Sequence, residues 1–437
     1  MKNVHLPHRI VGKPPRILKY LFPLILVLFI FILLACKGRG SNGNIPATAT
    51  LTAPVISTFT ASPSVITPGQ SSQLSWTVNN AVSLTLNGTA TTGIGTNISP
   101  MITTTYTLVA TNSTGSAAAS VTVTLGTLML TYGNMSAANF GAGANLNGAI
   151  PFPASNAWNT DMSTSPVDTN SSALISSIGL GTGLHPDFGA GLYSGAPIGI
   201  PYIVVTRSQP TATIIFVSYA DESDPGPYPV PMNAPIEGQQ ADGSAFGGDR
   251  HVLVIDRDSN LLYELANAYP QSNGVWTASC GAVFHLDSNS VRPNAQPGWT
   301  SADAAGLPIF PGLVRYEEAA SGVISHALRF TVNTTRQAYV PPATHWASSI
   351  TNPNLPPMGM RVRLKSDFSI PNGFSTESKA ILQALKTYGM FVADNGSNWY
   401  ISGAPDPRWD NDKLVSELGS VDGANFEVIH MDGLVTP

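Results

Sequence analysis

Short runs of alternating apolar and polar residues, separated by turn signals, fill the segment Pro54–Gly126. Alternation with a period of two is typical of a strand that buries one of its faces. The runs are VISTFTAS, SSQLSWTV, AVSLTLN, TTTYTLVAT and AAASVTVTL, with Pro-Gly-Gln, Asn-Asn, Asn-Gly and Asn-Ser-Thr-Gly between them. Several such strands within 73 residues predict a β-sandwich.

Three short patterns in this segment connect it to a known family. They are Phe59-x-Ala61-x-Pro63, Gly69-Gln70-Ser71-x-x-Leu74-x-Trp76 and Thr103-Thr104-Thr105-Tyr106-Thr107-Leu108. Through them, residues 54–126 resemble the bacterial Ig-like modules of cell-surface proteins. The resemblance implies that Trp76 is the core tryptophan of an inner strand. It also implies that the module is a spacer or a weak adhesive unit without catalytic residues.

The N-terminus has the layout of an export signal. Basic residues end at Lys19, and an apolar run of 16 residues, Tyr20–Ala35, follows. This run is shorter than the roughly 20 residues of a membrane-spanning helix. It ends in Leu33-Leu34-Ala35-Cys36, which resembles the lipobox of bacterial lipoproteins. The resemblance implies that the signal peptide 1–35 is removed and that Cys36 is lipidated, whereas an uncleaved signal anchor is the alternative.

Both interpretations place the remaining chain outside the cytoplasmic membrane. We therefore expect a lipid-anchored protein of the bacterial cell envelope, on the outer membrane or the cell surface. Cys36 and Cys280 are the two cysteines of the chain, which excludes a disulfide framework if Cys36 is lipidated. Because Cys280 lies among small and apolar residues, we expect a buried structural thiol rather than a nucleophile.

Charge is distributed unevenly along the chain. Residues 1–40 contain seven basic and no acidic residues, 41–160 contain no charged residue, and 161–437 contain 14 basic and 26 acidic residues. An acidic domain without a basic stripe binds nucleic acid poorly, because neutralised phosphates supply most of that affinity. Nucleic acid is therefore excluded as a partner.

Composition also indicates the domain boundaries. A polar, flexible tether is expected over 36–53, and a Gly/Ala/Asn-rich linker over 127–152. Acids, Trp and Pro become frequent after the linker, and we predict one domain over 153–437.

The large domain is predicted to be mainly β, sandwich- or barrel-like, with a few helices. Buried strands are expected at 200–206, 212–220, 251–256, 261–266, 327–332 and 360–364. One helix is indicated by Ser375 as its cap, Glu377 in its first turn, and apolar residues at helical spacing after them. Shorter helices are expected at 171–178 and 412–418.

Several strings in this domain are familiar from other proteins. They are Asp249-Arg250-His251, GWTSADAAGLPIFPGLVRYEE (298–318), HALRFTV (326–332) and ALKTYGMFVADNGSNWYISGAPDPRW (384–409). Through them, residues 152–430 resemble a set of secreted bacterial proteins without an assigned activity. The resemblance supports export and an intact domain, and it implies no site residue.

Two clusters of ionisable residues contain the candidate catalytic groups. Asp221, Glu222 and Asp224 follow the predicted strand 212–220, where loops commonly carry function. Carboxylates held close together have divergent pKa values, as glycosidases require, although a solvated turn is the alternative. Asp249 and His251 point to the same side of an extended chain, so they could form an acid–base pair or bind a metal. In the alternative, Asp249 pairs with a neighbouring arginine and His251 is a semi-buried polar group with its hydrogen bonds satisfied.

The remaining candidates concern substrate binding. Arg250, His326 and Trp399 are candidate substrate-binding residues, and six of the seven Trp lie in the large domain, where aromatic faces suit sugars. No zinc-binding spacing is present, and neither a metal nor a cofactor is predicted. Asp256-x-Asp258-x-Asn260 and Asp394-Asn395-Gly396 are both predicted to be hairpin turns.

Together these features favour a surface-anchored protein whose Ig-like spacer displays a domain that binds or cleaves extracellular polysaccharide. The chemistry would be that of a glycoside hydrolase or a lyase. A non-enzymatic surface adhesin or an envelope structural protein is the alternative.

Overall fold

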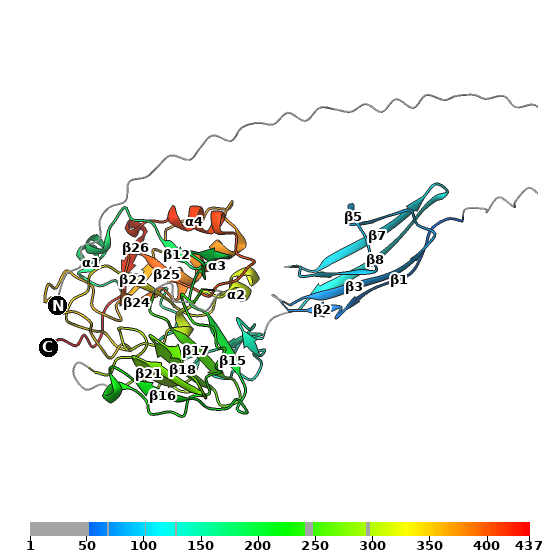
Figure 1. Cartoon of the computed structure of the whole chain (residues 1–437). Coiled ribbons are helices and arrows are strands. Elements are labelled where there is room, and N and C mark those ends of the chain that lie inside the picture. The colour runs from blue at the N-terminus through cyan, green and yellow to red at the C-terminus, as the bar shows by residue number, and fades with distance from the viewer. Residues whose placement is uncertain (1–51, 68–69, 101, 127–128, 241–247, 294–297) are drawn as a thin grey trace, which may run out of the picture. The chain divides into compact units, whose positions relative to one another are not determined.

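The computed structural model describes residues 52–67, 70–100, 102–126, 129–240, 248–293 and 298–437 (Figure 1). The predicted signal peptide, Cys36 and most of the tether lie outside the described residues. Within the described ranges, every helix is too short or too polar to span a bilayer. Most regular structure is β, as the sequence predicts.

Residues 55–125 form a two-sheet sandwich, which confirms the predicted fold of this segment. One sheet has the order β1 (Val55–Ser62), β3 (Ser72–Asn79), β6 (Gly95–Ile98). The other has the order β2 (Val65–Ile66), β8 (Gly115–Leu125), β7 (Thr104–Asn112), β4 (Ser83–Leu86), β5 (Thr89–Thr91). Trp76, on the central strand of the first sheet, is buried, and its indole N–H donates to Gly93 O at 3.0 Å. The expected core tryptophan is therefore where the alternation places it.

Two larger sheets build the second domain. A five-stranded sheet has the order β10 (Gly141–Ala142), β15 (Tyr202–Val205), β17 (Val252–Asp256), β18 (Leu261–Ala266), β21 (Cys280–His285). A six-stranded sheet has the order β12 (His185–Asp187), β25 (Tyr400–Ser402), β22 (Leu328–Val332), β24 (Met390–Asn395), β23 (Arg361–Leu364), β26 (Phe426–Val428). Among the strands that the structure describes, no sheet closes into a barrel, so the sandwich-like alternative holds.

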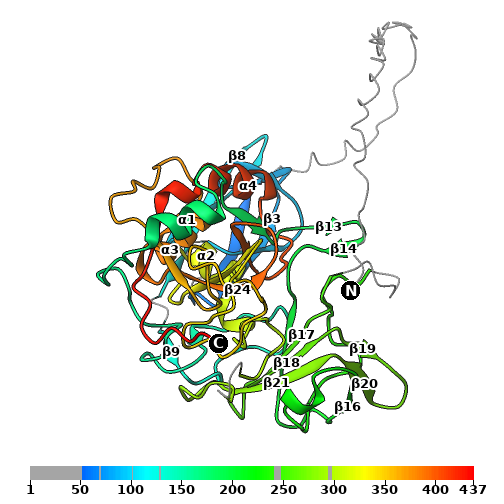
Figure 2. The same ribbon diagram turned by 90° about the vertical axis from the view of Figure 1, so that its left-hand side faces the viewer.

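Smaller elements surround these sheets. A three-stranded sheet has the order β16 (Thr213–Phe216), β20 (Val275–Ala278), β19 (Tyr269–Pro270), and β9 (Thr131–Tyr132) pairs with β11 (Ala149–Ile150). A hairpin of β13 (Leu192–Tyr193) and β14 (Ala196–Pro197) stands out from the rest of the domain (Figure 2). The helices are α1 (Ser171–Ile178), α2 (Tyr316–Ser321), α3 (Thr376–Thr387) and α4 (Asn411–Gly419). The predicted cap of α3 is confirmed, because Ser375 Oγ accepts from Ser378 N–H at 3.2 Å.

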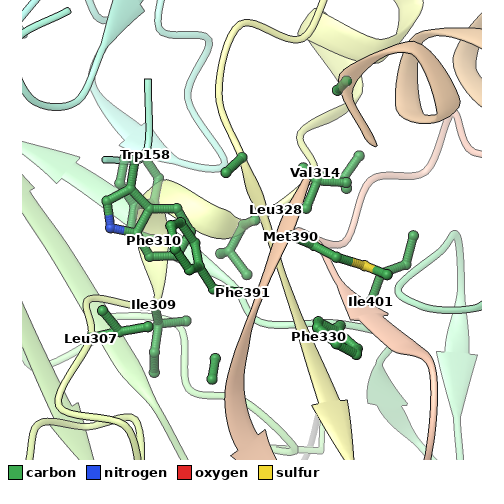
Figure 3. Close-up of a cluster of buried hydrophobic side chains, with 14 of the residues drawn as sticks. Trp158, Leu307, Ile309, Phe310, Val314, Leu328, Phe330, Met390, Phe391 and Ile401 are labelled. Atoms are coloured by element: carbon green, nitrogen blue, oxygen red, sulfur yellow. The ribbon is translucent and has the colours of Figure 1, made fainter. Parts of the chain in front are cut away.

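One buried apolar cluster contains side chains of both larger sheets. At its centre, the rings of Trp158 and Phe391 meet edge to face with centroids 4.9 Å apart (Figure 3). Gly312 lies against this pair, and a Cβ there would come within 2.7 Å of the Trp158 ring. The close approach explains why a glycine stands at this position.

Several sequence predictions for this domain need correction. The linker expected over 127–152 is wrong from residue 129 onward, because β10 pairs with β15 and Met135, Leu146 and Phe152 are buried in the core. Its small residues permit close packing rather than flexibility. The strand at 212–220 is shortened to β16, an edge strand with Ile215 and Val217 half exposed or more. The apolar run at 212–220 is therefore not a strand buried on both faces.

The two hairpin predictions have opposite outcomes. β17 and β18 pair through Asp256–Asn260 as expected, and the Asp256 carboxylate accepts from the N–H groups of Asp258 and Ser259. The Asn-Gly signal at 395–396 is wrong, because β22 lies between β24 and β25. Gly396 N–H instead donates to Val332 O at 2.9 Å, so pairing with β22 overrides the local turn preference.

Candidate functional site

A pocket of about 590 Å³ opens at the edge of the six-stranded sheet. β12, β25, the β13–β14 hairpin, α4 and the segment around Glu237 contribute to its walls. β12 and β25 are parallel, with His185 directly opposite Tyr400, and their rings stack with centroids 4.1 Å apart. Tyr193, on the hairpin, is 70% exposed and lines the same pocket. Carboxylate and aromatic side chains thus line the same pocket.

Glu237 is held in this pocket by a buried histidine. His251 Nδ1 lies 2.6 Å from Glu237 Oε2, and His251 Nε2 lies 3.0 Å from Ala302 O. A carboxylate and a carbonyl both accept, so this geometry suits a doubly protonated imidazolium. Burial alone would lower the pKa of His251, but the Glu237 carboxylate outweighs it and raises that pKa to about 9. His251 is therefore charged at neutral pH.

The same contact acts in the opposite direction on Glu237. Burial alone would raise the pKa of Glu237, but the charge and hydrogen bond of His251 hold it below its ordinary value of 4.5. Glu237 is consequently an anion over nearly the whole working pH range. Its carboxylate is fixed in orientation by the ring behind it.

Asp187, at the end of β12, is the second carboxylate of the pocket. Its side chain can be reached by solvent, yet the pocket walls displace part of its hydration, and this desolvation raises the pKa of Asp187 above 3.8. The charge of Glu237 raises the pKa of Asp187 further, whereas His185 and Arg329 oppose the rise. Two carboxylates of one pocket therefore have pKa values moved apart, the signature of an acid and a base.

A buried ion pair lies behind these groups. Arg329, on β22, donates to both carboxylate oxygens of Asp303 at 2.9 and 3.1 Å and to Ser402 Oγ at 2.5 Å. These hydrogen bonds use most of the donor capacity of the guanidinium, and the side chains of Arg329 and Asp303 are nearly inaccessible to solvent. Arg329 is thus part of the support beneath the pocket, not a group free to neutralise a substrate carboxylate.

The predicted pair Asp249–His251 separates in the structure. His251 is buried against Glu237, whereas Asp249 is exposed and affects the pKa of His251 only through its charge. Arg250, between them, has φ of +50°, so the two-residue alternation of an extended chain does not apply. In the part of the chain that the structure describes, no group of three His, Cys, Asp or Glu side chains could hold a metal ion.

The acidic loop 221–224 lies outside the pocket. Glu222 accepts from Thr300 N–H at 3.0 Å, and Asp224 pairs with the buried Arg292 guanidinium and accepts from Val283 N–H at 2.8 Å. These contacts attach the loop to β21 and to the segment after Gly298. Of the alternatives, the structural role fits Glu222 and Asp224, while Asp221 is the middle residue of a short 3₁₀ turn, Ala220–Glu222.

The three predicted substrate-binding residues are structural by their contacts. Arg250 is buried, donates to Ala268 O at 3.1 Å and lies 4.2 Å from the centroid of the Tyr269 ring. His326 is buried between Arg315 and Glu318, with its Nε2 2.9 Å from Arg315 Nη2 and 3.1 Å from both Glu318 carboxylate oxygens. None of the three lines the pocket.

Trp399 is fully buried, and this corrects its assignment as a sugar platform. Its ring stacks between Phe330 and Phe426 at 5.6 and 5.1 Å, and its N–H donates to Gly179 O at 2.9 Å. The other tryptophans of the domain are buried or half-buried. Tyr193 and Tyr400 supply the aromatic surface instead.

Sequence reasoning missed Glu237 and did not single out Asp187. His185-Pro186-Asp187 has the same i, i+2 spacing as Asp249-x-His251, so the alternation argument could have found it. Glu237 sits in the loop Pro235-Ile236-Glu237-Gly238, where no motif indicates a function.

Cys280 is the buried thiol that its neighbours predict. Its Sγ–H donates to Ser301 O at 3.0 Å, and burial raises the pKa of Cys280 to about 11. A thiol so disfavoured as an anion is a poor nucleophile. Comparison of the chain with family models, curated proteins and solved structures finds no match, and the geometry of the carboxylate pocket of Asp187 and Glu237 is what carries the functional argument.

Proposed function

We propose that the large domain binds extracellular polysaccharide in the pocket of Asp187 and Glu237 and hydrolyses its glycosidic bonds. One observation carries the proposal: two carboxylates line the same pocket, one with a raised and one with a lowered pKa. Glycoside hydrolysis requires this division between a proton donor and an anion.

The residues divide the reaction as follows. As the general acid, Asp187 would give a proton to the leaving glycosidic oxygen as the bond to the anomeric carbon breaks. Glu237 stays ionised and either accepts a proton from the attacking water or bonds to the anomeric carbon before water replaces it. His251 touches neither reacting atom, so it is a positioning residue that orients Glu237 and keeps it anionic.

The aromatic groups of the pocket support a sugar ligand. Tyr193 is largely exposed on its hairpin, and Tyr400 is held flat by the stacked His185 ring. Aromatic faces bury the apolar faces of sugar rings while ring hydroxyls bond to nearby carboxylates. The pocket volume lies within the usual range of small-molecule sites.

The chain order supports surface display. We propose that Cys36 carries a lipid anchor and that the sandwich 54–126 acts as a spacer between this anchor and the hydrolytic domain. An uncharged spacer rich in Ser, Thr and Asn stays hydrated without attracting charged polymers.

Activity on a panel of polysaccharides tests the proposal. A soluble chain of residues 52–437 is incubated with each polymer, and new reducing ends are measured beside the absorbance of unsaturated products. Hydrolysis yields the first signal only, whereas a lyase yields both. Asp187→Asn and Glu237→Gln should each lower the rate by about 10²-fold or more, since positioned acids and bases contribute on this scale.

Asp221→Asn is the matched control, because it removes an acid of the same domain that does not line the pocket. Its rate should equal that of the unmodified chain. Binding without turnover would favour the adhesin alternative, and an unchanged rate in both pocket variants would refute the assigned site.

A further inference from the structure

A second pocket, of about 380 Å³, adjoins the carboxylate pocket at Pro197. Pro197 ends β14 and lines both pockets, and the residues before the β13–β14 hairpin also reach both, Phe188 on one side and Gly189 on the other. The two pockets are therefore neighbours that share this segment. Each pocket alone has the volume of a ligand site, so together they offer room for more than one sugar unit.

The second pocket has few polar side chains. Gly and Pro form most of its wall, among them Gly143, Pro201 and Pro235. Its phenol, Tyr202, already donates to Ala144 O at 2.8 Å. Its carboxylate, Asp406, is paired with Arg408. A ligand in this pocket would therefore meet a mostly apolar surface, and at the glycines it could come close to the protein backbone.

Among the described residues that line the two pockets, His185 is the one with a basic side chain. Of the described lining residues, none is Lys or Arg. The ionised Glu237 faces the first pocket, and Asp406 adds a second carboxylate to the other. Arg329, whose charge lowers the pKa of Asp187, is buried in its ion pair with Asp303. Glu237 and Asp406 are already paired with His251 and Arg408, so no Lys or Arg among the described lining residues is left to pair with the carboxylates of an acidic polymer.

We infer that the polymer is a neutral glycan chain that spans both pockets, and that polyuronates and sulfated glycans are rejected. The inference rests on the proposed function and narrows its substrate class. It follows from the two neighbouring pockets, the Gly and Pro wall of the second pocket, and the absence of Lys and Arg among the described lining residues of both.

Matched polymers that differ only in charge test the charge part of this inference. We would use hydroxyethyl cellulose against carboxymethyl cellulose, methyl-esterified against de-esterified homogalacturonan, and esterified against free alginate. Binding to the full-length chain is measured by affinity electrophoresis at low salt, and cleavage by new reducing ends. In any pair that is bound, the neutral form should bind at least tenfold more tightly, which corresponds to about 1.4 kcal/mol.

The outcomes separate the two proposals. Preference for the charged form of a pair would overturn the inference and leave the proposed function standing. If no polymer of any pair were bound or cleaved, the proposed function itself would fall.

Chain length tests the second pocket. Ala142 is exposed on β10 and lines that pocket, so Ala142→Trp should fill it without disturbing the core. We expect at least tenfold weaker binding of the long neutral chain and a smaller loss for a trisaccharide. Ala220→Trp, at an exposed position outside both pockets, is the matched control and should bind as the unmodified chain does. Equal effects of Ala142→Trp on long and short ligands would refute a chain that spans both pockets.

Discussion

Replacement of His251 by glutamine removes the charge behind Glu237 and should change how stability depends on pH. The pKa of His251 rises from an ordinary 6.5 to about 9 on folding, because Glu237 accepts its proton at 2.6 Å. A raised pKa stabilises the folded state below pH 6.5, and this stabilisation is lost as the pH rises through about 9. Each pKa unit corresponds to about 1.4 kcal/mol, so the contribution is on the order of 3 kcal/mol.

The free energy of unfolding is measured for both chains from pH 6.5 to 10, by urea denaturation followed through tryptophan fluorescence. Six of the seven Trp lie in the large domain, so the signal reports mainly on its unfolding. We expect the advantage of the unmodified chain over His251→Gln to shrink by about 3 kcal/mol across this range. The difference in the free energy of unfolding between the two chains removes the contribution of other groups that titrate in the same range.

His285→Gln is the matched control, because this histidine is exposed at the end of β21. Its profile should run parallel to that of the unmodified chain. If the His251→Gln profile also runs parallel between pH 6.5 and 10, then His251 is not the charged partner of Glu237, and the assignment of Glu237 as a fixed anion loses its basis.

Three further predictions follow from other parts of the chain. Trp399→Ala should lower the free energy of unfolding by about 3–5 kcal/mol, the usual cost of deleting a buried aromatic ring, as measured by urea denaturation; a loss below 1 kcal/mol would contradict its place in the core. Asp224→Asn should cost about 1–3 kcal/mol because the buried Arg292 loses its charged acceptor, while hydrolysis stays unchanged once the chain is folded; a specific loss of activity would restore the acidic loop as a catalytic candidate. Cys36→Ser should move the protein out of the membrane fraction or block its maturation, detected by fractionation and intact mass; an unchanged membrane fraction and mass would exclude lipidation.

Some features were predictable because they depend on neighbours within a few residues. Alternating side chains predicted the strands of the sandwich, because each of these strands buries one face. Continuous apolar runs predicted β17, β18 and β22 of the large domain, which are buried on both faces. The cap of α3 was equally local, because Ser375 bonds to a group three residues away. Cys280 was correctly placed by its apolar surroundings.

The candidate site could not be predicted from neighbouring residues in the sequence. Asp187, Glu237 and His251 come from three separate parts of the chain, and they meet only because β12 joins the edge of one sheet while His251 precedes a strand of the other. Even the two-residue argument for Asp249 and His251 failed, since one backbone angle at Arg250 turned them apart.

The sequence by itself determined the β-rich character, the sandwich and its core tryptophan, and the caps and turns that short-range sterics and hydrogen bonds control. Tertiary structure alone decided that β22 separates β24 from β25 despite Asn395-Gly396, that Trp399 is enclosed by Phe330 and Phe426, and that Glu237 and Asp187 line the same pocket. The physical reason is that strand order and burial minimise the free energy of the whole core, in which contacts between distant segments outweigh the preference of any one turn or side chain.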